Sequence, residues 1–144
     1  MKIQFSVEGQ PLSKSNNLQF AKGRAFIPAK FKDYEKKIQE AARVAFQGDP
    51  ISGPVRMSIQ LWFKDRRIRD CQNYPKTICD ALNDIIYKDD SQIVELYVTK
   101  LKRDEPGLDV TIEALAPDDR YPLKHQSLMV MTTHNFFQRS HGIN

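Results

Sequence analysis

The strongest structural signal in the chain is the stretch Val55-Arg56-Met57-Ser58-Ile59-Gln60-Leu61-Trp62-Phe63. Apolar residues occupy every second position from Val55 to Phe63, which is the two-residue period of a strand with one buried face. Trp62 falls on the polar side of that alternation, so we expect its indole to be half exposed. We therefore predict one strand here, with its apolar side turned toward the core.

The sequence on both sides of this strand predicts three more strands and two helices. The spacing of apolar residues places strands at 3–7, 93–102 and 108–115 and helices at 31–46 and 73–86. The second helix is expected to begin at the N-cap residue Asn73 and to run for about 20 Å, which separates the residues at its two ends. Residues 9–30 are typical of a loop, with a short strand allowed at 25–27.

The order of these elements indicates the fold class. The loop between the last two predicted strands contains Pro106 and Gly107, which is typical of a hairpin. Strand, helix, strand, helix and hairpin together predict an α/β (α+β) fold, in which two helices pack on a mixed β-sheet.

Length and composition restrict the class of protein. The 144 residues suit one domain, predicted at 1–119, followed by a C-terminal extension at 120–144 whose order the pattern does not define. With 40% hydrophobic residues, 6 Gly and 8 Pro, the chain is neither collagen-like nor wholly disordered. No apolar run of about 18 residues and no leader-like start are seen, so we expect neither membrane contact nor export. Cys71 and Cys79 are too few for a disulfide framework, so we expect reduced thiols in the cytoplasm.

Positive charge is concentrated in one part of the chain. Residues 1–103 hold 19 Lys and Arg against 12 Asp and Glu, whereas residues 104–119 hold six acids and no base. This distribution suits a polyanionic partner, although many basic domains bind no nucleic acid. There is no Gly-rich phosphate loop and no zinc-finger spacing of histidines, so no nucleotide cofactor is expected.

Residues suited to catalysis are concentrated between Asp70 and Gln92. Asp70 precedes the second predicted helix, and the Asp89-Asp90 pair follows it. Neighbouring carboxylates repel, and a bound magnesium ion would relieve that repulsion and act on a phosphodiester. The carboxylates can meet only if the chain folds back or if two subunits share the site. The alternative is that the Asp pair is an ordinary turn and that Asp70 caps the helix or pairs with Arg67.

The order and spacing of residues in this stretch resemble the RusA family of Holliday-junction resolvases. The chain has Asp70-x-Gln72-Asn73-x-x-Lys76, Asp80-Ala81-Leu82-Asn83 and Asp89-Asp90-Ser91-Gln92-Ile93. The family has Asp-x-Asp-Asn-x-x-Lys, Asp-Ala-Leu-Asn-Gly and Asp-Asp-x-Gln-Ile. The resemblance extends toward the N-terminus, where the chain has Phe5-x-Val7-x-Gly9-x-Pro11, Lys14 and Gly23-Arg24-x-Phe26-x-Pro28. In total it covers residues 3–115.

The resemblance implies a homodimeric, Mg²⁺-dependent endodeoxyribonuclease in which Mn²⁺ can substitute. Such an enzyme resolves four-way DNA junctions by paired symmetric nicks in recombination and repair. Asp70 and Asp90 are implied to hold the metal ion with Asp89 beside them, while Lys76 stabilises charge on the scissile phosphate or the leaving oxygen. A two-fold dimer would match the two-fold symmetry of the junction.

The basic and aromatic residues of the same region are candidates for DNA contact. Candidates for binding the backbone are Lys14, Lys22, Arg24, Lys30, Lys32, Arg66, Arg67, Arg69 and Asn73. Candidates for stacking on exposed bases are Phe20, Phe26 and Tyr74. Ordinary packing is the alternative for these aromatic residues, and it is favoured for Phe26.

The chain departs from the family at Gln72, where the family has its second catalytic Asp. A Gln oxygen can contact a cation, so Gln72 is a weaker candidate ligand, but it adds no charge and is no base. The chain therefore binds junctions without cutting, cuts slowly, or recruits another carboxylate. The other carboxylates available are Asp65, Asp80 and Asp84, of which the last two also have lysines at helical spacing. A structural alternative is a basic dimer that uses the hairpin and the tail for protein contacts.

Overall fold

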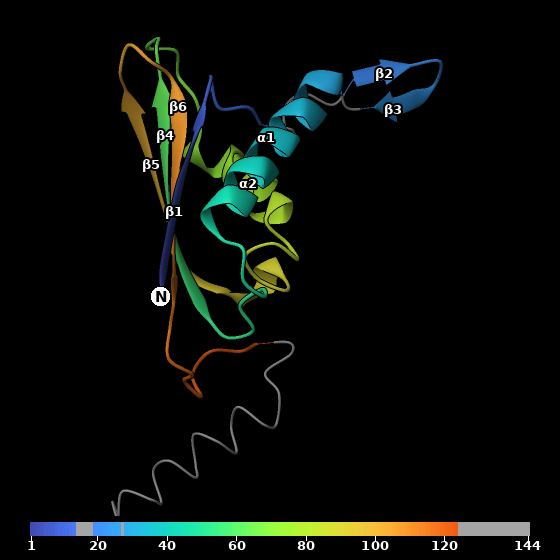
Figure 1. Cartoon of the computed structure of the whole chain (residues 1–144). Helices are drawn as coiled ribbons and strands as arrows, with labels where there is room; N and C mark the ends of the chain where they lie inside the picture. The colour runs from blue at the N-terminus through green and yellow to red at the C-terminus, as the bar shows by residue number, and fades with distance from the viewer. Residues whose placement is uncertain (14–18, 27, 124–144) are drawn as a thin grey trace, which may run out of the picture.

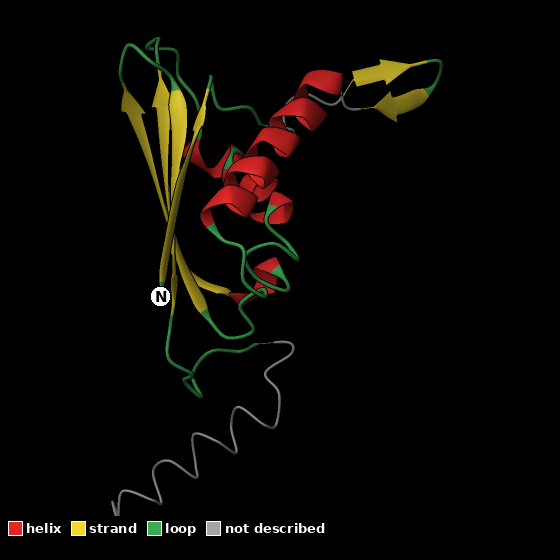
Figure 2. Cartoon of the chain, viewed as in Figure 1, coloured by secondary structure: helices red, strands yellow, loops and turns green. Residues whose placement is uncertain are grey.

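The computed structural model describes residues 1–13, 19–26 and 28–123. Its main layer is a mixed four-stranded sheet with helices on one face (Figures 1 and 2). The sheet has the order β1-β6-β4-β5. Its strands are β1 (Lys2–Glu8), β4 (Val55–Phe63), β5 (Ile93–Lys102) and β6 (Gly107–Ala114). The helices are α1 (Ala29–Ala45) and α2 (Pro75–Ala81). The predicted α+β class, a mixed sheet with two helices packed on it, is confirmed.

The predicted hairpin between the last two strands is wrong, because β4 lies between β5 and β6. β4 pairs antiparallel with β6 and parallel with β5. Neighbouring strands are about 4.8 Å apart, so β5 and β6 are about 10 Å apart, a distance that the short loop at 103–106 can span. Arg103 N–H donates to the Phe63 carbonyl (3.0 Å) as this loop passes the end of β4. A short Pro-Gly loop therefore indicates proximity but not pairing.

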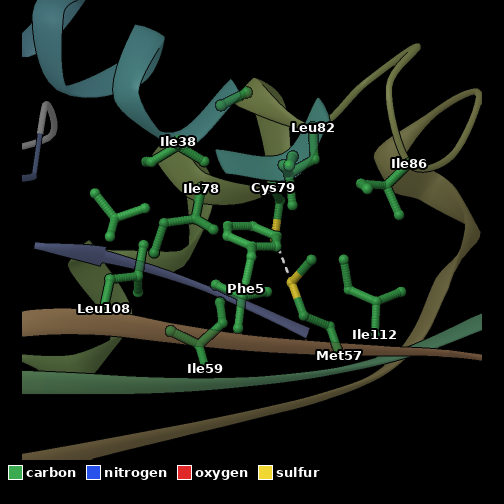
Figure 3. Packing of buried hydrophobic residues seen from close by; sticks show 14 of the residues in the cluster. Phe5, Ile38, Met57, Ile59, Ile78, Cys79, Leu82, Ile86, Leu108 and Ile112 are labelled. Atoms are coloured by element: carbon green, nitrogen blue, oxygen red, sulfur yellow. Dashed lines mark hydrogen bonds between the residues drawn. The ribbon is translucent and has the colours of Figure 1, made fainter. Parts of the chain in front are cut away.

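The core forms between the sheet and the two helices. β1 and β4 bury every second residue, as their alternation predicts. Figure 3 shows Phe5 of β1, Met57 of β4 and Ile38 of α1 meeting Ile78 and Cys79 of α2. The Cys79 thiol lies 3.7 Å from the sulfur of Met57.

The other face of the sheet is polar. Arg56 bonds Glu95 of β5 (2.7 Å) and Glu113 of β6 (3.2 Å), so it bridges the strands on either side of β4. Trp62 is half-buried on this face, as predicted, and its indole N–H donates to Asp109 (2.8 Å).

A two-stranded hairpin projects from the N-terminal end of α1, away from the sheet (Figure 1). Its strands are β2 (Gln19–Ala21) and β3 (Arg24–Phe26), and only a strand near the second of these was expected. Lys22 (φ 51°) and Gly23 (φ 76°) form the turn with two positive φ angles, a turn type that matches the twist of the strands it joins.

The predicted helix at 73–86 is replaced by shorter elements. A 3₁₀ turn, η1 (Cys71–Asn73), precedes α2, and Tyr74 rather than Asn73 holds the N-cap position. α2 ends at Ala81, and Asp84 adopts φ 65° in the turn that follows. The Tyr87 hydroxyl donates to the Cys79 carbonyl (2.6 Å), which fixes this turn against the helix. The apolar residues after Ala81 are thus buried without being helical.

Several predictions fall on residues that the structure does not describe. Residues 14–18, 27 and 124–144 lie outside it, as do the side chains at 19–21. Lys14, the side chain of Phe20 and most of the predicted C-terminal extension belong to this group. Within the described ranges, no helix has the length and apolar character needed to cross a membrane.

Candidate active site

The short α2 brings two carboxylates from different parts of the chain into contact. Seven helical residues rise only about 10 Å, and the chain folds back after Ala81, so the two ends of the motif are not kept apart. Asp90 then lies beside the C-terminal half of α2, where its carboxyl group interacts with that of Asp80. Partial burial, the contact with Asp80 and the charge of Asp89 raise the pKa of Asp90 above the usual value for a carboxyl group.

Lys76 completes a short polar chain next to this pair. Its ammonium nitrogen lies 3.5 Å from Asp80 Oδ2, one helical turn away, and its side chain is 79% exposed. The pairing of Asp80 with Lys76 at helical spacing is confirmed. Because an exposed ion pair of this kind contributes little to stability, the ammonium is readily available to an incoming phosphate.

Asp89 holds the loop that presents Asp90. Asp89 is the N-cap of the 3₁₀ turn η2 (Asp90–Gln92), and its side chain accepts from the backbone N–H of Ser91 (3.2 Å) and from the Ser91 hydroxyl. The Gln92 side chain accepts from Asp89 N–H (2.9 Å) and donates to the carbonyls of Ile51 (2.7 Å) and Gly53 (2.9 Å). Asp89 and Gln92, the first and last residues of the Asp-Asp-x-Gln motif, thus fix the position of Asp90.

Asp70 and Gln72 lie in the segment that enters α2. Asp70 occupies the N-cap position of η1 but makes no side-chain cap bond, and its carboxyl group is exposed. Gln72 is also exposed, and Asn73 is half-buried, with its carbonyl accepting from the hydroxyl of Ser13. Within the described residues, no three His, Cys, Asp or Glu side chains come close enough to hold a metal ion. The sharing of one ion by Asp70, Asp89 and Asp90 stays a prediction.

The loop between β4 and η1 carries three of the arginines predicted to bind DNA. Arg66 and Arg67 are exposed. Arg69 instead makes contacts within the protein. Its guanidinium donates to both carboxylate oxygens of Asp65 (2.5 and 3.1 Å) and lies 4.3 Å from the Phe63 ring centre. Asp65 is therefore engaged, and its pKa is lowered to about 2 by the hydrogen bond from Arg69.

The remaining predicted DNA contacts lie near the projecting hairpin. Arg24 and Lys30 are exposed there, and Lys30 Nζ lies 5.1 Å from the Phe31 ring centre. Phe26 is 42% exposed, so the prediction that it is packed is wrong. Tyr74 is buried, with its ring edge-on to Phe63 at 5.5 Å, which is ordinary packing.

Sequence reasoning undervalued Asp80. It named this residue as one of three carboxylates that could replace the missing one, but it favoured pairing with Lys76 as the role of Asp80. The available signal was the Asn83-Asp84 dipeptide, since Asn and Asp tolerate the left-handed backbone that ends a helix.

Comparison with known proteins identifies the family to which the chain belongs. The family model for "Endodeoxyribonuclease RusA" matches residues 8–113. A protein of Bacillus subtilis named only as "Uncharacterized protein YqaN" is 32% identical over 79% of this chain and 97% of its own length. The crossover junction endodeoxyribonuclease RusA of Shigella sonnei is 31% identical over 71% of this chain and 88% of its own. The protein of the same name from Aquifex aeolicus is 28% identical over 76% and 90%. The chain is a member of the RusA family of endodeoxyribonucleases.

Proposed function

We propose that this protein is a metal-dependent endonuclease that resolves four-way DNA junctions by paired symmetric nicks. The observation that carries the proposal is the contact between the Asp80 and Asp90 carboxyl groups beside Lys76, in a chain of the RusA family. The proposal places the protein in the cytoplasm, in DNA recombination and repair.

The carboxyl pair suits a hard divalent cation. Two carboxylates in contact repel unless a proton or a cation lies between them, and their oxygens are the ligands that Mg²⁺ and Mn²⁺ prefer. Asp80 and Asp90 would hold the ion, and Asp70, whose side chain makes no cap bond, stays the further ligand that the motif predicts. When bound, such an ion polarises a phosphodiester and activates water.

The remaining residues of the site have supporting roles in this proposal. Asp89 and Gln92 hold the position of Asp90, and the Lys76 ammonium stabilises negative charge at the scissile phosphate. Asp80 supplies the carboxylate that is lacking at Gln72. Arg24, Lys30, Arg66 and Arg67 are exposed cations that can neutralise backbone phosphates, and Lys14 and Asn73 stay candidates.

A homodimer belongs to the proposal because the substrate needs two cuts. A two-fold dimer presents two equivalent sites to a substrate with the same symmetry. β5 is an edge strand, so its backbone edge is open to pairing with a second copy. Its exposed Leu96 (44%) and Tyr97 (53%) point to opposite faces of the sheet, one on each side of that edge.

Gln72 favours a second function, in which the protein binds branched DNA and cuts it weakly or not at all. A neutral amide in place of a carboxylate lowers the charge available to the cation. This alternative predicts junction binding without products, and it predicts that Gln72→Asp creates or raises cleavage.

The two functions are separated by measuring metal binding and cleavage on the same variants. Mn²⁺ binding is measured by isothermal titration calorimetry, and cleavage is measured as nicking of a synthetic four-way junction. We expect Asp90→Asn to lose both, and Asp80→Asn to weaken both at least tenfold. Asp84→Asn is the matched control, because it makes the same charge change in the adjacent turn, where Asn tolerates the positive φ. Efficient cutting by Asp80→Asn would contradict the role given to Asp80. Junction binding without cutting by the unsubstituted protein would favour the second function.

A further inference from the structure

The loop between Lys64 and Asp70 carries the most exposed large apolar side chain of the described residues. Ile68 is 92% exposed and directly follows the exposed Arg66 and Arg67. A single exposed isoleucine is common on protein surfaces and indicates nothing by itself. Ile68 differs from such a residue in two respects: hydrogen bonds fix the loop that carries it, and basic side chains surround it.

The loop is fixed on both sides of Ile68. On one side, Asp65 Oδ1 accepts from Arg67 N–H (3.1 Å) and both Asp65 oxygens accept from the Arg69 guanidinium. On the other side, the Arg69 carbonyl accepts from the Lys100 ammonium of β5. Arg69 also stacks on Phe63, at the end of β4. Ile68 is therefore presented to solvent by a braced loop, with little ordering left to do on binding.

A groove of 240 Å³ runs beside this loop and is strongly basic. Its lining includes the cations Arg66, Arg67, Lys100 and Lys102 together with Ile68. The one carboxylate in the lining, that of Asp65, is already held by Arg69. Among the described residues, neither arginine of the lining forms an ion pair, so their charge faces the groove and the solvent. Ile68, the last residue of the loop in this lining, lies two positions before Asp70, the N-cap of η1, so the loop leads along the chain into the segment that enters α2.

We propose that this basic groove holds one phosphodiester strand of branched DNA and that Ile68 inserts beside an unstacked base at the branch point. The inference rests on the proposed function for the identity of the substrate, and it adds the residue that distinguishes a branch from a linear duplex. The cations neutralise phosphates whatever the sequence or shape of the DNA. An isoleucine can act as an apolar wedge between bases, and unstacking costs least where base pairing is already interrupted.

The test uses the full chain, a four-way junction and a linear duplex of the same sequence, with Ca²⁺ replacing Mg²⁺ to prevent cutting. The junction carries 2-aminopurine at the branch point, so that unstacking raises its fluorescence. Ile68→Ser is expected to lower junction affinity about tenfold, to leave duplex affinity unchanged and to remove the fluorescence rise. Val44→Ser on α1, at a site that is 79% exposed, is the matched control and is expected to behave as the natural chain does.

The cations are tested separately. Arg66→Ala combined with Arg67→Ala is expected to weaken junction and duplex alike and to reduce the slope of log affinity against log salt by about 2. If the natural chain prefers the junction and Ile68→Ser keeps both the preference and the fluorescence rise, the wedge is overturned while the proposed function stands. If the natural chain has no preference for the junction, the proposed function and the wedge fail together.

Discussion

Replacing Gln92 tests the bracing of the candidate site and has a magnitude that follows from the structure. The side chain is buried and makes three hydrogen bonds, to Asp89 N–H and to the carbonyls of Ile51 and Gly53, at 2.7 to 2.9 Å. Each bond contributes about 1 kcal/mol net, and buried groups left without a partner cost more. We therefore expect Gln92→Ala to lower the free energy of unfolding by about 3 kcal/mol.

This loss is measured by urea denaturation followed by circular dichroism. With a denaturant slope of about 1.5 kcal/mol/M, the midpoint falls by about 2 M. Gln60→Ala is the matched control, because Gln60 is exposed on the polar face of β4, and its change should stay within about 0.5 kcal/mol. Equal midpoint shifts for the two variants would refute the reasoning and leave Asp90 without its support.

Three further predictions concern the carboxyl pair, the thiols and the core. Because folding raises the pKa of Asp90, the ionised Asp90 carboxylate destabilises the folded state at neutral pH, and this destabilisation is relieved as the pH falls and Asp90 is protonated. Asp80→Asn should therefore raise the urea midpoint of the metal-free protein at pH 7 and raise it less at pH 4. Burial raises the pKa of the Cys79 thiol to about 12, so a thiol reagent at pH 8 should modify the half-buried Cys71 in the folded protein and Cys79 only after unfolding. Leu61→Ala, at a fully buried position of β4, should lower the free energy of unfolding by about 3 kcal/mol in the same urea assay.

The elements that the sequence predicts well are those whose signal is local. The alternation from Val55 to Phe63 and the helical spacing over 31–46 each reflect one buried face, and both elements appear as expected. Pairing is not local, so the strand order could not be read from the Pro106-Gly107 loop. β5 shows this most clearly. It lies at the edge of the sheet and pairs parallel with β4, and the long connection between these two strands gives no local sign of that pairing.

The same distinction applies to the candidate site. The motif named Asp70, Lys76 and Asp90, but their distances depend on where α2 stops. Ile85 and Ile86 fit the helical period, whereas the hydrogen bond from Tyr87 to the Cys79 carbonyl and the left-handed Asp84 end the helix earlier. The contact between Asp80 and Asp90 depends on this early helix end, which the Asn83-Asp84 dipeptide signals locally and the helical period of the apolar residues conceals.

The most direct test of the central claim is the mapping of nicks on a four-way junction whose strands are labelled one at a time. In Mg²⁺, the account predicts two nicks at symmetry-related phosphates on opposite strands, and products that DNA ligase reseals into linear duplexes. Asp90→Asn should bind the same junction and release no product. A junction that stays intact with the natural chain and with Gln72→Asp, at every Mg²⁺ and Mn²⁺ concentration tried, would contradict the account.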